Sequence, residues 1–95
     1  MNKIKQFYEQ KKLECKLTIR EFVRLINLKL KQMPGKTSTV YITKASLSQW
    51  MNGKNRMSSY IIANAIGQII NCTAGEIIKT VEHDYILNSV KGGTK

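Results

Sequence analysis

The sequence predicts an all-α fold of five helices. Apolar residues recur three and four positions apart along most of the 95-residue chain, which is the spacing of one face of an α-helix. The chain contains a single proline, a residue that interrupts helices. Two threonines are each followed three positions later by glutamate, and such pairs mark helix starts because they satisfy the free N–H groups of a first turn. We therefore expect one compact domain over residues 1–90 and a flexible tail over residues 91–95.

The first helix is expected over residues 4–14, and the second begins after Thr18. The hydroxyl of Thr18 can cap that second helix while Glu21 completes a capping box. The second helix is expected to continue to Met33, because Pro34 disfavours helical backbone at the residue before it.

The remaining three helices also have recognisable ends. Thr43 is expected to cap a third helix over residues 44–51, which ends at an Asn-Gly pair that tolerates left-handed backbone. A fourth helix is expected over residues 59–70, with Asn71 at its end. A fifth helix begins at the second Thr-x-x-Glu pair and covers residues 74–90.

The charges are unevenly distributed. Between Phe22 and Gly75 the chain has no Asp or Glu, and all of its charged residues there are basic. A region of one sign predicts a polyanionic partner, and nucleic acid fits best because each Lys or Arg placed against a phosphate releases a condensed counterion. An acidic protein would also be attracted. The basic residues of this stretch are Arg24, Lys29, Lys31, Lys36, Lys44, Lys54 and Arg56.

The composition is that of a basic globular domain without a catalytic site. The chain has 16 Lys and Arg against 6 Asp and Glu, a formal net charge of +10, and 42% apolar residues, which suffice for a small core. Cys15 and Cys72 are far apart and His83 is the only histidine, so we expect free thiols, no metal, no cofactor and no enzymatic activity. No signal peptide or long apolar run is evident, so we expect a cytoplasmic protein without a membrane partner.

Residues 42–54 carry several features in a fixed order. An apolar residue and an N-cap hydroxyl precede exposed polar positions, and Leu47 and Trp50 are expected in the core, although an aromatic ring can instead stack on single-stranded bases. An Asn-Gly-Lys sequence follows. This order resembles the recognition-helix segment of the lambda-repressor-like helix-turn-helix family, the Cro and CI type. Residues 66–78 are similar to the closing stretch of that family, so the resemblance covers about residues 4–78.

The resemblance implies a sequence-specific regulator of transcription that binds double-stranded DNA, such as the repressor of a phage or mobile-element switch. A helix about 10 Å wide fits the roughly 12 Å major groove. Gln49 would pair with an adenine edge, Lys44 would donate to guanine or phosphate, and Ala45 would contact a thymine methyl group. Taken singly, each is also an ordinary solvated position. The expected contacts to the DNA backbone are Thr43, Ser46, Ser48, Asn52, Lys54, Asn55 and Arg56.

Between the second and third helices the sequence departs from the family, in which a turn of a few residues is usual. Residues 27–43 fill this interval as an insertion. The second helix continues into it as far as Met33, and residues 36–42 are expected to follow as an extended link. Lys29, Lys31 and Lys36 are expected either to contact phosphates beside the groove or to belong to a solvated loop. Gly67 lies within the fourth helix at a cost of about 1 kcal/mol relative to alanine, which close helix packing would explain.

The fifth helix carries more apolar residues than one inward-facing stripe requires. Part of this surface is expected to meet a second copy, and a symmetric dimer would set two recognition helices about 34 Å apart on a pseudo-palindromic operator. The alternative is that these residues close the core of a monomer. A different function is also open, that of a protein-binding modulator or antirepressor that docks on a repressor. The expected dimer residues are Val81, Tyr85, Ile86, Leu87 and Val90.

Overall fold

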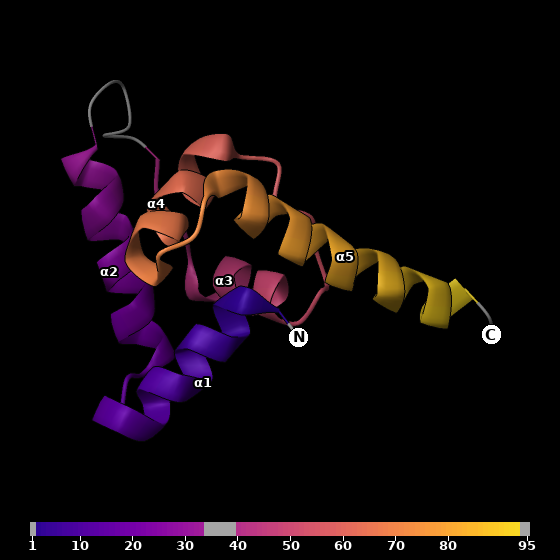
Figure 1. The fold of residues 1–95 in the computed structure, drawn as a ribbon, viewed down its shortest axis with the longest axis horizontal. Helices are drawn as coiled ribbons and strands as arrows, with labels where there is room; N and C mark the ends of the chain where they lie inside the picture. The colour runs from indigo at the N-terminus through magenta and orange to yellow at the C-terminus, as the bar shows by residue number, and fades with distance from the viewer. Residues whose placement is uncertain (1, 34–39, 94–95) are drawn as a thin grey trace.

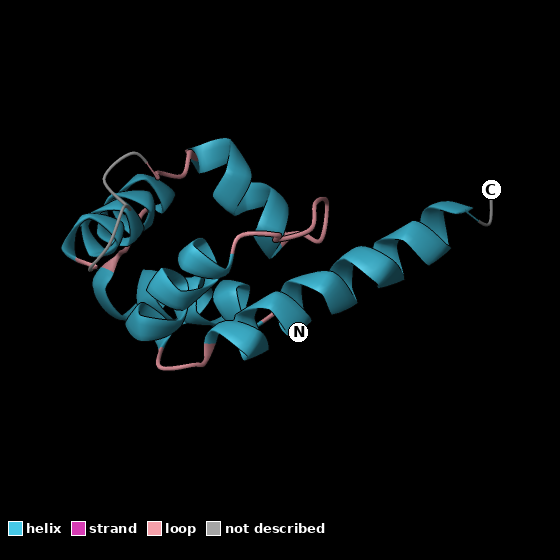
Figure 2. Cartoon of the chain, turned by 90° about the horizontal axis from the view of Figure 1, so that it is seen from above, coloured by secondary structure: helices cyan, strands magenta, loops and turns pink. Residues whose placement is uncertain are grey.

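The computed structural model describes residues 2–33 and 40–93, and this part of the chain forms five helices and no strand (Figures 1 and 2). The all-α prediction is therefore confirmed. The helices are α1 (Lys3–Cys15), α2 (Ile19–Gln32), α3 (Lys44–Met51), α4 (Tyr60–Ile70) and α5 (Ala74–Gly93). The segment that precedes α3, residues 40–43, is not helical.

Both capping boxes form as predicted. The Glu21 backbone N–H donates to Thr18 Oγ1 at 3.2 Å, and the Thr18 N–H donates to Glu21 Oε1 at 3.1 Å. Thr73 and Glu76 repeat the arrangement at the start of α5, with both distances at 3.1 Å. These bonds satisfy main-chain donors that a first helical turn cannot satisfy internally. At α4 the cap is Ser59, so the helix begins one residue later than expected.

Left-handed residues turn the chain at three helix ends. Asn71 ends α4 with φ 64°, as predicted. After α3, Gly53 has the positive φ of 65°, while Asn52 keeps φ −107°. Lys16 ends α1 with φ 58°, which nothing in the sequence indicated because lysine rarely adopts this conformation.

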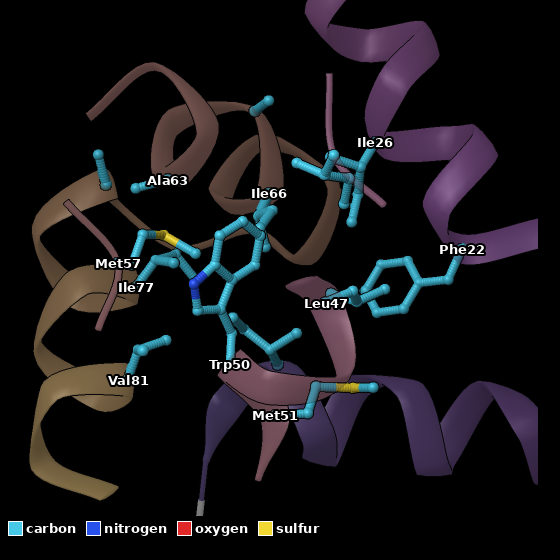
Figure 3. Packing of buried hydrophobic residues seen from close by; sticks show 14 of the residues in the cluster. Phe22, Ile26, Leu47, Trp50, Met51, Met57, Ala63, Ile66, Ile77 and Val81 are labelled. Atoms are coloured by element: carbon cyan, nitrogen blue, oxygen red, sulfur yellow. The ribbon is translucent and has the colours of Figure 1, made fainter. Parts of the chain in front are cut away.

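The core lies where all five helices meet, and α3 contributes three of its side chains. Trp50 is 8% exposed and packs among apolar side chains of α4 and α5, so its predicted place in the core is confirmed (Figure 3). Its indole N–H donates to the Arg56 carbonyl at 3.2 Å, which satisfies its one polar atom. The buried residues from the five helices are Ile4, Phe22, Ile26, Leu30, Leu47, Trp50, Met51, Ala63, Ala65, Ile66, Ala74, Ile77 and Val81.

Helices α4 and α5 pack against each other across a tight bend of 104°. A Cβ atom at Gly67 would overlap the Cys72 carbonyl oxygen, and the Gly67 carbonyl accepts a hydrogen bond from the Cys72 N–H at 2.8 Å. Close packing therefore explains the glycine, but its partner is the α4–α5 turn instead of another helix. Among the described residues, no individual helix has both the length and the apolar character needed to cross a membrane.

Helix α5 extends three residues beyond the predicted end at Val90, and its last turns project away from the other helices (Figures 1 and 2). Val81 is fully buried in the core, so its assignment to a dimer surface was wrong. It points inward because it lies four residues after buried Ile77 on one face of the helix. Ile86, Leu87 and Val90 have exposed fractions of 46%, 47% and 60%.

Candidate nucleic-acid interface

Helix α3 presents one exposed polar face. Lys44, Ala45 and Gln49 are exposed, as the sequence predicted, while Leu47 and Trp50 face the core. Ala45 and Gln49 are four residues apart and so lie one above the other on the same face. These two side chains mark the centre of the exposed face of α3.

The start of α3 is fixed by Thr43. Its hydroxyl oxygen accepts a hydrogen bond from the Ser46 N–H and donates one to Ser46 Oγ, both at 3.1 Å. Thr43 is exposed, whereas Ser46 and Ser48 are half-buried. The two serines therefore lie at the borders of the exposed face, where they can make secondary contacts only.

The loop over residues 52–56 carries the remaining predicted contacts on its exposed side. Lys54, Asn55 and Arg56 are all exposed. Asn55 Nδ2 donates to Gln49 Oε1 at 3.4 Å, a long bond that links this loop to the predicted base-reading side chain. Asn52 instead folds back on α3, because its Nδ2 donates to the Ser48 carbonyl at 2.8 Å. Its side chain is thus engaged within the protein.

Helix α5 supports this loop. Asn88 Nδ2 donates to the carbonyls of Asn52 and Gly53 at 2.8 and 3.0 Å. A Cβ atom at Gly53 would lie 2.8 Å from the Asp84 carbonyl oxygen, so only glycine lets the loop approach the helix this closely. The loop that leaves α3 is therefore held against α5 by hydrogen bonds from the Asn88 side chain to its main-chain carbonyls and by the close approach at Gly53.

Tyr85 takes part in the same support. The Arg56 guanidinium lies over the Tyr85 ring, 5.1 Å from its centroid, a cation–π geometry. Tyr85 is half-buried. The sequence had assigned it to a dimer surface, but the structure gives its ring a partner on its own chain.

The side of α2 next to α3 is also basic. Asn27 bonds to the main chain of Ile42, just before α3. Arg24 and Lys31 lie three residues before and four residues after Asn27, so they share its side of α2. Lys29 is half-buried and lies only two residues from Asn27, which places it on a different side. Lys36 lies outside the described residues.

Within the part of the chain that the structure describes, none of these basic residues forms an ion pair. The salt bridges there join Lys3 to Glu76, Lys11 to Glu14 and His83 to Asp84, and all of them lie outside the acid-free stretch. The interface cations are therefore not neutralised by the protein. The cations concerned are Arg24, Lys31, Lys44, Lys54 and Arg56; Lys29 forms no ion pair either but lies on a different side of α2.

Several residues that shape this surface have no signal in the sequence. Asn27 and Asn88 bond to main-chain atoms 15 and 35 or 36 residues away, and a contact over that separation leaves no local pattern. For Arg24 the sequence holds a weak indication. Arg24 and Lys31 are seven residues apart, a spacing that places both on one side of a helix.

The geometry thus consists of a short capped helix with an exposed polar face, a supported basic loop and a basic side of α2. Comparison of the chain with protein-family models, with curated protein sequences and with solved structures finds no match. The function of this surface has to follow from its own residues.

Proposed function

We propose that the protein is a sequence-specific regulator of transcription that binds double-stranded DNA, with α3 as its recognition helix. A repressor of a phage or mobile-element type of switch is the form we favour. The observation that carries the proposal is the exposed polar face of α3 within a stretch whose charges are all basic. A helix whose only role is to pack in the core does not require an exposed polar face surrounded by basic residues.

Base reading is assigned to the centre of the exposed face. Gln49 has an amide that can donate to and accept from an adenine edge, and Ala45 is small enough to contact a thymine methyl group. Lys44 is one residue from Ala45 and can reach guanine acceptors or a phosphate. Asn55 holds the Gln49 amide through one long bond, which an adenine could replace.

Phosphate binding is assigned to the cations around α3. Lys54 and Arg56 follow α3 in the chain. Arg24 and Lys31 lie on the side of α2 from which Asn27 bonds to Ile42, just before α3 begins. Such contacts position a protein on the duplex without reading its sequence. The resulting affinity should fall with salt, because each phosphate contact releases counterions.

A symmetric dimer is part of the proposal. Ile86, Leu87 and Val90 are exposed apolar residues on the projecting end of α5, and a second copy offers the same surface. Two recognition helices would then bind half-sites about 34 Å apart.

The test is selection of bound duplexes from a random DNA pool, followed by titration of the selected duplex across a salt series. We expect a palindromic consensus and an affinity that falls steeply with salt. Weak binding without a consensus would contradict the proposal.

The second candidate is a modulator that docks on another regulatory protein. The exposed apolar residues at the end of α5 favour it, because they can receive a different protein as well as a second copy. This function needs no sequence preference in DNA, so the same selection separates the two candidates.

A further inference from the structure

Helix α3 is too short and too polar to hold its own position. It has eight residues, two of them serine, and serine is only a moderate helix former. Helices of this length are marginal in water unless tertiary contacts stabilise them. Its buried side chains fix its inner face, and hydrogen bonds from other parts of the chain act in addition at its two ends.

The start of α3 is held by α2. Asn27 Oδ1 accepts a hydrogen bond from the Ile42 N–H at 2.8 Å, and Asn27 Nδ2 donates to the Ile42 carbonyl at 3.1 Å. One amide thus satisfies both main-chain groups of a residue that lies directly before the Thr43 cap. Ile42 is itself 4% exposed, so these main-chain groups would otherwise be poorly solvated.

The end of α3 is held by α1 and α5. Asn2, which is 2% exposed, donates from Nδ2 to the Trp50 carbonyl at 2.9 Å. Asn88 donates to the Asn52 and Gly53 carbonyls just beyond the helix. The last carbonyls of a helix lack donors within the helix. Asn2 supplies such a donor to the Trp50 carbonyl, and Asn88 holds the two residues that follow the helix.

We propose that Asn2, Asn27 and Asn88 act as positioning residues, an asparagine clamp that fixes α3 before it meets DNA. This inference rests on the proposed function for its consequences in binding. Preorganisation reduces the ordering cost of association, and the two ends of the clamp govern different contacts. Asn27 fixes the position of the start of α3, which carries the proposed base-reading residues. Asn88 fixes the position of the loop that carries Lys54 and Arg56.

The experiment compares Asn27→Ala and Asn88→Ala with the control Asn64→Ala, a half-buried asparagine of α4 that bonds to no part of α3 among the described residues. Each folded variant is titrated with the selected duplex and with a scrambled duplex of equal length. Asn27→Ala removes two hydrogen bonds to Ile42 and should lower the ratio of the two affinities by about twofold to tenfold, the change that corresponds to the net contribution of one such bond. Asn88→Ala should weaken both complexes alike and reduce the salt slope by about one phosphate contact.

Amide hydrogen exchange of the free variants supplies a readout without DNA. Faster exchange over α3 in Asn27→Ala and Asn88→Ala, but not in Asn64→Ala, is expected if the clamp fixes the helix. Unchanged exchange rates would overturn the clamp. A variant with reduced thermal stability but wild-type DNA affinity at temperatures where it is folded would overturn it as well. If the wild-type protein binds DNA without preference, the proposed function fails, and the exchange rates alone decide the clamp. Asn88 is exposed, so its variant decides the outcome if Asn27→Ala does not fold.

Discussion

Gly53 and Gln49 are four residues apart, but the fold restricts which amino acid can occupy the first and leaves the second free to vary. Gly53 has φ 65°, and a Cβ atom there would lie 2.5 Å from Asn88 Nδ2. Gln49 is exposed on the outer face of α3, where its one bond within the protein is long. The first residue is therefore fixed by the fold, and the second is available to a partner.

Replacement of Gln49 by alanine should change sequence preference and leave the fold unaffected. We expect discrimination at one base position to fall by about 1–3 kcal/mol, the contribution of one bidentate side chain to base readout. Titration with the selected duplex and its single-base variants measures this loss. Lys54→Ala is the matched comparison and should weaken all duplexes alike while reducing the salt slope by about one. A Gln49→Ala variant with wild-type preference at every position would show that α3 does not read bases there.

At the scale of elements, the sequence predicted those helix starts that depend on residues close together in the chain. Thr18 and Thr73 bond to residues three positions away, so their capping boxes are visible in the sequence and both are confirmed. Val81 was misassigned because the apolar residues of α5 follow more than one stripe, and only packing against the other helices decides which stripe is buried. The hydrogen bonds from Asn27 and Asn88 to the segments beside α3 were not predicted, because they join distant parts of the chain.

The start of α5 should show a distinct acid dependence. The Thr73 N–H, and then the Lys3 ammonium, donate to the Glu76 carboxylate and lower its pKa from 4.5 to about 2. A lowered folded-state pKa contributes stability that is complete above the unfolded value and is lost as the pH falls from about 4.5 towards 2. Thermal unfolding of Glu76→Gln should therefore show a deficit at neutral pH that shrinks over this range. Glu82→Gln, an exposed change on the same helix, is the control, and a deficit independent of pH would contradict the assignment.

For the whole molecule, α5 has two roles along its length. Its first half closes the core through Ile77 and Val81. Its second half supports the loop after α3 through Asn88 and carries exposed apolar side chains. The end of the helix extends away from the other helices (Figure 1). Any partner that binds the projecting end is therefore connected to the loop after α3 through one continuous helix.

Substitution of Leu87 by aspartate should dissociate the proposed dimer. Burial of a leucine contributes about 1.5–3 kcal/mol, so affinity for a palindromic duplex should fall about tenfold to a hundredfold, while affinity for a single half-site should stay unchanged. Analytical ultracentrifugation measures the accompanying loss of dimer. Leu13→Asp, at an 88% exposed leucine of α1, is the control. A wild-type monomer at all protein concentrations would refute the dimer.

The asparagine clamp has a consequence for how the protein can change over time. Its bonds end on main-chain atoms of Ile42, Trp50, Asn52 and Gly53, which almost every amino acid possesses. The outward side chains of α3 can therefore be exchanged without loosening the helix. Under the proposed function, a lineage that carries this scaffold can acquire new operators through a few surface substitutions while its folding stability stays nearly constant.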